Sequence, residues 1–516
     1  MMKKLLFTFM ISTSAFCAEA EQPWVSLGAD GRLIYRSDPQ GNRIPNFSGV
    51  GYGTGNCPLP LVPVRLTLRP WSGDQTKRIQ DSLDTLAKLP LAADGFRGTL
   101  VLKRGEYPVS GTIFIRASGI VLRGEGQDLK TGTVIRDTGK DKDPLILICG
   151  AGKPELEKIP RKILDAYVPV GANTVRLDGI NGLSVGDTVM LTRGSNEQWI
   201  KFIGADKPGV DWPVRFAEVK WDRVITAIRG DTVQLDAPVT TAIEERFGGA
   251  VLARYSWPGR IEKCGVENLI AISDHTNPKD EDHSWRAVDI ANAQHVFVRN
   301  FVAQHFAYSA VHIATTSKWV TVTDCKSIDP ISTIAGGRRY SFCMDGQLSL
   351  MRRCLASKGR HDFVCNEYKV AGPNVFLDCK AVNAYSESGP HRHWTSGVLW
   401  DNVTISDRLS FYHRKNYGRR HKKPPYHLGH GWAAANCVAW NCTIAKQLIV
   451  ESPPGAHNWA IGCKAGSFVT NGPERGVKKG AGQFQSKNQP VAIRSLYEAQ
   501  LAERMRTSGS GTQMIR

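Results

Sequence analysis

One repeated pattern decides the fold: VTVTDCKS (residues 320–327), LSLMRRCLA (348–356) and VFLDCKA (375–381). In each copy apolar residues alternate, and then Asn, Asp, Arg or Gly stands directly before Cys or another mostly apolar residue. Five more segments have the same form: VENLIAI, VFVRNFVAQ, VLWDNVTI, VAWNCTIA and WAIGCKA. Alternation of this kind predicts short strands with one buried face.

The spacing of these segments indicates how the strands are arranged. Aligned on the residue after the polar one, they give Leu269, Phe301, Cys325, Cys354, Cys379, Val403 (or its neighbour Asn402), Cys442 and Cys463. Most intervals lie between 21 and 32 residues, which is one coil of a parallel β-helix. Antiparallel hairpins would also alternate, but they would lack this single repeated phase. The sequence therefore predicts stacked coils with ladders of equivalent residues inside.

The flanking sequence predicts the remaining architecture. Short strands separated by Gly turns fill residues 98–126, and DQTKRIQDSLDTLAKL (74–89) has the apolar spacing of a helix, which would cover the open end of the coils. Short strands joined by Gly-Asp and Asp-Gly turns then replace the coil pattern and indicate an inserted small β-domain. The predicted parts are a signal peptide (1–20), an N-terminal segment with the capping helix (21–95), first coils (96–154), the inserted domain (155–255), main coils with the active-site groove (256–470) and a C-terminal tail (471–516).

The N-terminus predicts export. MMKKLLFTFMISTSAFCAEA combines two lysines, an apolar run and a small-residue stretch that fits cleavage after Ala20, so a secreted or periplasmic enzyme is expected. A lipoprotein is the disfavoured alternative, because Phe16 precedes Cys17. No later apolar run is long enough to span a bilayer.

The chain carries a formal net charge of +18, which attracts polyanions. An exported chain without a recognisable nucleic-acid module is expected to meet an anionic polysaccharide rather than nucleic acid.

The cysteines fit the same repeat. We interpret them mainly as small apolar members of a core ladder, although neighbouring coils would also allow some disulfides. CxxC-type spacing is absent, so the sequence predicts no zinc site.

Several segments resemble a known superfamily. After the helix, LKRGEYPVSGTIFI and LRGEG resemble the start of the pectin-lyase-like right-handed β-helix superfamily. GGRRYSF, GRHDFV, GPNVFLDC, GPHRHWTSGVLWDNV, HGWAAANCVAWNC and PPGAHNWAIGC resemble secreted bacterial β-helix proteins related to polysaccharide lyases. The resemblance covers about two thirds of the chain and implies an all-β, right-handed parallel β-helix. It is less specific for the reaction, because the superfamily also contains hydrolases, epimerases, esterases and phage adhesins.

The histidines indicate where chemistry is located. All 13 lie between His275 and His457, and most occur in clusters with Arg and aromatic residues about one coil apart, so we expect a column along one face. The predicted catalytic residues are His391, His393, His361, Tyr412 and His413. The predicted substrate-binding residues are Arg338, Arg339, Tyr340, Arg360, Arg392, Arg414, His430 and Trp432. An extended HRHW segment would put His391 and His393 on one side, whereas a turn would bring Arg392 into the cleft.

These residue types suit β-elimination from a uronate polymer. A base must remove the proton at C5, an acid must protonate the 4-oxygen, and a cation must neutralise the carboxylate. Neutral His suits the base, Tyr the acid and Arg the cation. We expect His312 and His295, which fit strands, to be structural. The basic run YHRKNYGRRHKKPPYH (412–427) contains the same residue types. It also fits a second interpretation, a solvated basic loop.

Two alternative functions stay open. A glycoside hydrolase would use a pair of carboxyl groups, for which Asp345, Asp362, Glu367, Glu387 and Glu451 are candidates without an obvious paired motif. A non-catalytic β-helix would only bind glycan. No cofactor is predicted, and the one acidic segment suited to Ca²⁺, DHTNPKDEDH (274–283), is interpreted as a solvated loop.

Overall fold

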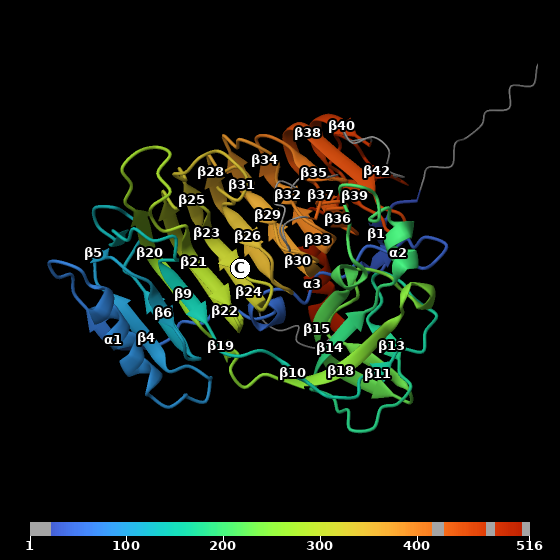
Figure 1. The fold of residues 1–516 in the computed structure, drawn as a ribbon, viewed down its shortest axis with the longest axis horizontal. Helices are drawn as coiled ribbons and strands as arrows, with labels where there is room; N and C mark the ends of the chain where they lie inside the picture. The colour runs from blue at the N-terminus through green and yellow to red at the C-terminus, as the bar shows by residue number, and fades with distance from the viewer. Residues whose placement is uncertain (1–21, 415–427, 471–479, 508–516) are drawn as a thin grey trace, which may run out of the picture.

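The computed structural model describes residues 22–414, 428–470 and 480–507. They form a right-handed parallel β-helix, so the predicted fold class is confirmed (Figure 1). In the described part of the chain, no helix has the length and apolar character that a membrane crossing needs. The predicted signal peptide and most of the basic run after Arg414 lie outside the described residues.

The first face of the β-helix is a seven-stranded parallel sheet. Its strands are, in spatial order, β6 (Ile113–Ile115), β9 (Ile146–Cys149), β21 (Arg286–Ala291), β23 (Ser309–Ile313), β26 (Phe342–Met344), β29 (Phe363–Cys365) and β32 (Gly389–Pro390). This face carries most of the polar clusters.

The other two faces belong to one continuous 24-stranded network. Before the bend in each coil lie β3 (Val64–Leu68), β4 (Gly98–Leu102), β7 (Ile120–Arg123), β19 (Ile261–Glu262), β20 (Gly265–Ser273), β22 (Ala293–Gln304), β24 (Lys318–Thr323), β27 (Leu350–Arg352), β30 (Ala371–Leu377), β33 (Thr395–Asp401), β36 (Ala434–Ala435), β37 (Val438–Trp440), β39 (Trp459–Ile461) and β42 (Gln483–Gln485). The remaining strands are β5 (Gly105–Val109), β8 (Thr133–Asp137), β25 (Lys326–Ile328), β28 (Leu355–Ser357), β31 (Lys380–Val382), β34 (Thr404–Ile405), β35 (Leu409–Phe411), β38 (Thr443–Ser452), β40 (Lys464–Val469) and β41 (Gly480–Ala481). Strands β20 and β22 run through the bend into both faces.

The bend explains the repeated sequence pattern. The polar residue of each copy has a positive φ between 49° and 69°, the left-handed region that Asn, Asp and Gly tolerate best; these residues are Asn268, Asn300, Asp324, Arg353, Asp378, Asn402, Asn441 and Gly462. The residue that follows each of them is buried in the core. Asn402 is therefore the corner residue, and Val403 is the core position.

The ends of the β-helix are covered by helices and by the N-terminal segment. Helix α1 (Thr76–Ala87) buries Ile79, Leu83 and Leu86 against the first coils, which confirms the predicted capping helix. Helix α3 (Leu496–Thr507) packs with the hairpin β1 (Val25–Leu27)–β2 (Leu33–Tyr35) and the short helix η1 (Tyr52–Gly55) outside the second face. The described end of the chain is thus docked rather than a free tail.

Residues 155–256 form an antiparallel sheet beside the β-helix, at the lower right of Figure 1. It contains β10 (Glu155–Leu156), β11 (Arg161–Lys162), β13 (Thr174–Arg176), β14 (Thr188–Arg193), β15 (Val219–Arg229), β16 (Thr232–Leu235) and β18 (Ala250–Ser256). Nearby lie the pair β12 (Tyr167–Val168)–β17 (Ile243–Glu244), helix α2 (Glu197–Phe202), η2 (Val214–Ala217) and η3 (Glu245–Phe247). Its core includes Trp199 and Trp212 together with Trp394 and Trp432 from the main coils. The insert therefore packs on the β-helix through a shared apolar core.

The eleven cysteines in the described residues form no disulfide, and all except Cys57 and Cys149 are buried. Cys325, Cys354 and Cys379 are buried in the core at equivalent positions of successive coils, as the ladder interpretation predicts.

Candidate functional site

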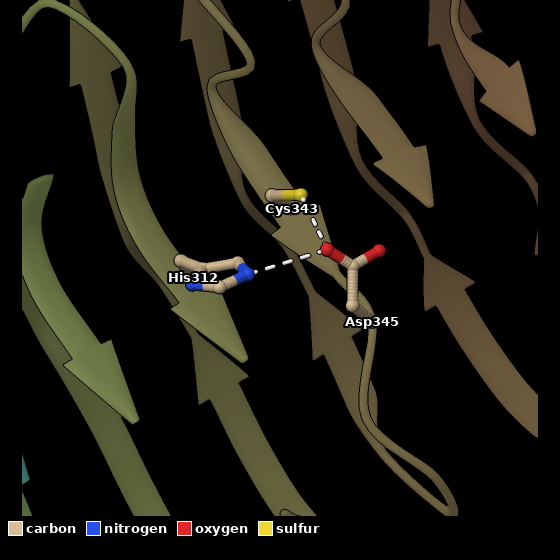
Figure 2. Close-up of side chains that lie close together, drawn as sticks. All are labelled: His312, Cys343 and Asp345. Carbon is tan, nitrogen blue, oxygen red and sulfur yellow. Dashed lines mark hydrogen bonds and ion pairs between the residues drawn. The ribbon is translucent and has the colours of Figure 1, made fainter. Parts of the chain in front are cut away.

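The outer surface of the first sheet carries a polar row across neighbouring coils. Asp289 on β21 is in register with His312 on β23, which is in register with Cys343 on β26. His312 Nδ1 lies 2.7 Å from Asp289, and its Nε2 lies 3.2 Å from Oδ2 of Asp345, directly after β26. Cys343 Sγ lies 3.2 Å from the same oxygen (Figure 2). Burial alone would lower the pKa of His312, but Asp289 and then Asp345 raise it to about 9.

Asp345 is held rigidly in this row. Its second oxygen, Oδ1, accepts the backbone N–H groups of Asn366 and Glu367 at 2.6 and 2.9 Å. Burial, and then the charge of Asp345, raises the pKa of Glu367. His312 lies on strand β23, as expected, and it also contacts carboxylates of neighbouring coils and lies in register with a thiol.

The predicted histidines come together, but beneath the surface. Ring centroids are 4.9 Å apart for Tyr340–His361, 4.4 Å for His361–His391 and 5.2 Å for His391–His430. None of the four side chains is more than 8% exposed. The predicted column thus exists as a buried stack, and the prediction that it lines an open groove is wrong in this respect.

The hydrogen bonds of the stack assign its tautomers. His361 Nδ1 donates to the carbonyl of Glu387, and His393 Nε2 donates to the carbonyl of Gly429. His391 Nε2 lies 3.2 Å from the hydroxyl of Tyr340. Burial lowers the pKa of all three imidazoles, to about 3 for His361 and His393, so they are neutral at pH 7.

The HRHW segment is a turn after β32, so His391 and His393 do not share one side of a strand. Arg392 is partly exposed, with its guanidinium 5.3 Å from the ring centroid of Tyr368, and its entry into a cleft stays a prediction. Arg360 is also half-exposed and donates to Tyr340 at 3.5 Å.

Other residues predicted to bind substrate instead contact groups of the protein itself. Arg338 pairs with Glu281 at 2.8 Å, and buried Arg339 donates to the carbonyls of Ser332 and Lys358. Trp432 is 1% exposed and donates to the carbonyl of Ile203. Arg339 and Trp432 therefore stabilise packing, and their assignment as substrate contacts is corrected.

Tyr412, His413 and Arg414 are buried as well. The ring of His413 lies 5.0 Å from that of Trp432, whereas Arg414 lies 2.6 Å from Glu387 beside the histidine stack. Burial would raise the pKa of Glu387, but Arg414 and then His361 hold it well below its ordinary value.

The carboxylates of the acidic segment 274–283 bind other groups of the protein. Asp280 accepts from the backbone of Thr276 and Asp282, and Glu281 holds Arg338. This arrangement supports the interpretation as an acidic loop.

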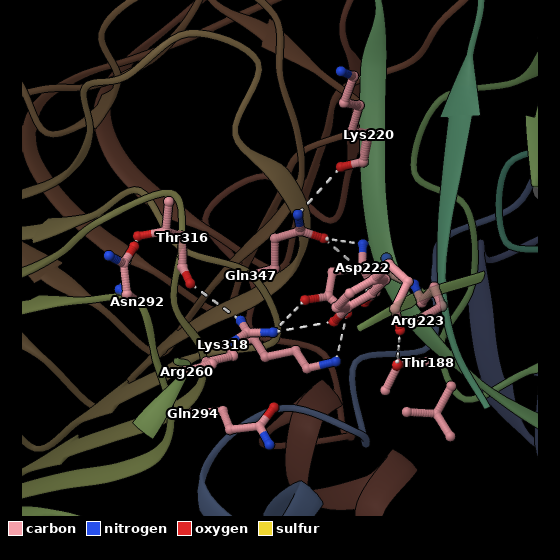
Figure 3. Close-up of polar contacts among 12 residues, drawn as sticks. Thr188, Lys220, Asp222, Arg223, Arg260, Asn292, Gln294, Thr316, Lys318 and Gln347 are labelled. Carbon is pink, nitrogen blue, oxygen red and sulfur yellow. Dashed lines mark hydrogen bonds and ion pairs between the residues drawn. The ribbon is translucent and has the colours of Figure 1, made fainter. Parts of the chain in front are cut away.

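An open pocket of about 390 Å³ lies where the inserted domain meets the coils. The lining residues from the insert include Arg215, Glu218, Lys220 and Asp222, and those from the coils include Lys318, Asp345, Gln347, Tyr368 and Lys369. One wall is rigid, because Asp222 binds Lys318 at 2.5 Å and Arg260 at 2.6 Å, while Gln347 accepts from the backbone of Asp222 (Figure 3). Arg215 and Lys220 remain exposed to the pocket.

No protein-family model and no curated protein sequence matches this chain. Among solved structures it is similar to the tailspike protein of Pseudomonas phage LKA1, with 12% identity, a TM-score of 0.46, and 76% of this chain and 56% of the tailspike covered. It is also similar to polygalacturonase from Erwinia carotovora ssp. carotovora (8% identity, TM-score 0.41, 84% and 98% covered) and to alginate lyase from a Paenibacillus strain (8%, 0.38, 83% and 99%). These are likenesses of fold.

Besides Arg215 and Lys220 of the insert, the pocket residues that sequence reasoning missed include Lys369 and Tyr368. Both are half-buried and follow β29 as Arg392 follows β32, one coil later. Burial lowers the pKa of Lys369; the carboxylate of Glu218 opposes this change and Lys220 adds to it. Their position in the coil, shortly after a strand of the first sheet, would have identified them, whereas their residue types would not.

Proposed function

We propose that this protein is a polysaccharide lyase that cleaves a uronate-containing polymer in the pocket between the insert and the coils. The observation that carries the proposal is the joint lining of one pocket by Tyr368, Lys369, Arg215 and Lys220. These residues supply a base, an acid and two cations, the complement that β-elimination requires. The net charge of +18 would attract the polymer.

In the proposed reaction Arg215 and Lys220 bind the uronate carboxylate. Neutral Lys369 removes the C5 proton, and the electron pair of the C5–H bond becomes the C4–C5 double bond. The C4–O4 bond breaks, and Tyr368 donates its proton to the departing oxygen. Burial lowers the pKa of Lys369 from its ordinary value, which makes the neutral amine that this step needs easier to form.

The buried histidines take a supporting role in this proposal. The ring centroid of His393 lies 4.4 Å from that of Tyr368, and Phe216 lies 4.8 Å from Tyr368 on the insert side. These contacts fix the orientation of the tyrosine. His393 thus acts as a positioning residue behind the pocket, and His391 and His361 lie further from it, linked to His393 through the ring of His430.

The test is incubation of the purified protein with a panel of acidic polysaccharides. A lyase produces new reducing ends together with the ultraviolet absorbance of a 4,5-unsaturated uronate. Reducing ends without that absorbance would contradict the proposal, as would binding of every polymer without cleavage.

Glycoside hydrolysis is the second candidate, because Asp345 lines the pocket and a second carboxyl group, that of Glu367, lies near enough for the charge of Asp345 to raise its pKa. It predicts that Glu367→Gln abolishes cleavage while Lys369→Met retains it. The lyase proposal predicts that Lys369→Met abolishes cleavage.

We also propose that the chain is exported, from the features of residues 1–20. Mass spectrometry of the mature protein should then show an N-terminus at Glu21. An N-terminus at Met1 in the exported fraction would contradict this.

A further inference from the structure

We propose that His312, Cys343 and Asp345 form a binding site for a divalent transition metal ion, with Zn²⁺ as the best-fitting ion. One ligand atom from each of the three residues lies within 4.8 Å of the others. The atoms that face each other in Figure 2 are His312 Nε2, Cys343 Sγ and Asp345 Oδ2. Imidazole, thiolate and carboxylate are all ligands that zinc accepts.

The surroundings of the site fit a metal centre. His312 Nδ1 points to Asp289 Oδ1 at 2.7 Å, so the carboxylate holds the ring with Nε2 toward the site. Metal-bound histidines usually donate their second N–H to such a carboxylate. Asp345 is oriented in turn by the backbone N–H groups of Asn366 and Glu367.

A divalent ion would also balance the charge of the bound ligands. On binding, the ion takes the place of the proton on His312 Nε2 and of the thiol proton of Cys343, both of which face Asp345 Oδ2. The thiolate and the carboxylate of Asp345 then carry two negative charges, which one divalent ion balances, and Asp289 stays paired with the Nδ1–H of His312. Both ligand residues are buried, and such charges require compensation. Asp345 lines the pocket, so an ion can reach the site from solvent.

A second cluster in the described residues, His361, Glu387 and His391, also has three ligand atoms within 4.8 Å. There, however, the guanidinium of Arg414 lies 2.6 Å from Glu387 and already provides its counter-charge. A metal ion would have to bind next to that cation. This cluster therefore serves as the internal control.

The experiment measures metal binding, independently of polysaccharide cleavage. The full mature protein is stripped with EDTA and titrated with Zn²⁺ by calorimetry, and with Co²⁺ by absorption spectroscopy. One tight Zn²⁺ per chain and a thiolate-to-cobalt charge-transfer band are expected. Cys343→Ser and His312→Gln should abolish both, and Asp289→Asn should weaken binding about 10–100-fold.

Two matched variants separate ligand loss from damage to the fold. Cys365→Ser changes another buried cysteine one strand away, and His361→Gln changes the control cluster. Both should keep the stoichiometry and the cobalt band. Absence of tight binding by the wild type, unchanged binding in folded Cys343→Ser, or loss of binding in folded His361→Gln would each overturn the proposal. If Cys343→Ser does not fold, metal binding by His312→Gln and the cobalt band of the wild type test the proposal instead.

Discussion

At the residue scale, the pocket depends on side chains whose ionisation the fold has changed. Lys369 is the principal example, because partial burial favours its neutral amine. Its neighbour Tyr368 is fixed by aromatic contacts with His393 and Phe216.

We expect Lys369→Met to reduce the turnover number by about 10²–10⁴-fold, the usual contribution of a proton-transfer group. Lys446→Met is the matched control, because Lys446 lies on β38, where its charge pairs with Asp407. In the wild type, activity should rise with pH through the lowered pKa of Lys369, since only the neutral amine accepts the proton. Full activity of Lys369→Met, measured by initial rates, would remove Lys369 from the mechanism.

The buried ion pair beside the histidine stack predicts a stability effect. Arg414→Ala leaves Glu387 buried with its principal counter-charge removed, so the free energy of unfolding should fall by about 3–5 kcal/mol. Arg408 contacts the same carboxylate at 3.4 Å but is 38% exposed, and Arg408→Ala should cost about 0–1 kcal/mol. Denaturant titration of both variants tests this, and equal losses would refute it.

At the scale of single elements, each coil bends at one residue in the left-handed region. The bend turns a strand of the second face into a strand of the third and directs the next residue into the core. Local chemistry accounts for this element, since Asn, Asp and Gly tolerate positive φ.

Asn300 is an exposed corner residue with φ 49°. Asn300→Ala should destabilise the protein by about 1–2 kcal/mol, because alanine is strained in this region. Asn300→Gly should have little effect. Thermal melts of the two variants provide the test, and a glycine variant less stable than the alanine variant would contradict this account of the bend.

At the scale of the whole molecule, the first and last described segments pack against the coils. Asp401, at the end of β33, accepts from the hydroxyl of Ser495 and the backbone N–H of Tyr497, and so holds α3. Burial raises the pKa of Asp401 to about 7, although both hydrogen bonds oppose this change.

Docking of α3 should therefore depend on pH. The folded-state pKa of Asp401 lies above the ordinary value, so its stabilising contribution is complete in acid and is lost as pH rises through about 7. The protection of α3 against hydrogen exchange, corrected for the intrinsic rate at each pH, should fall as pH rises from the ordinary pKa of an aspartate to about 7 in the wild type, and less in Asp401→Asn. An identical pH profile in both proteins would rule out this role.

Much of the architecture follows from local or periodic signals in the chain. Coil length, the corner residues, the cysteine ladder and helix α1 each depend on spacing that a strand or helix imposes on its own sequence. The concentration of histidines on one side of the β-helix was also visible, because equivalent positions recur with each coil.

The sequence by itself thus determined the coil, its corners, its core and its capping helix. Only the tertiary structure decided which polar residues face solvent and which residues meet. Stacking of coils pairs His312 with Cys343, 31 residues later, and packing of the insert brings Lys220 to the pocket of Lys369. The coil length varies, so spacing alone does not fix which residues of neighbouring coils are in register, and it carries no information about the insert. Burial of His361, His391 and His393 is likewise a property of what packs over the first sheet. We therefore propose the pocket and the polar row beside it as the functional site, in place of the predicted histidine column.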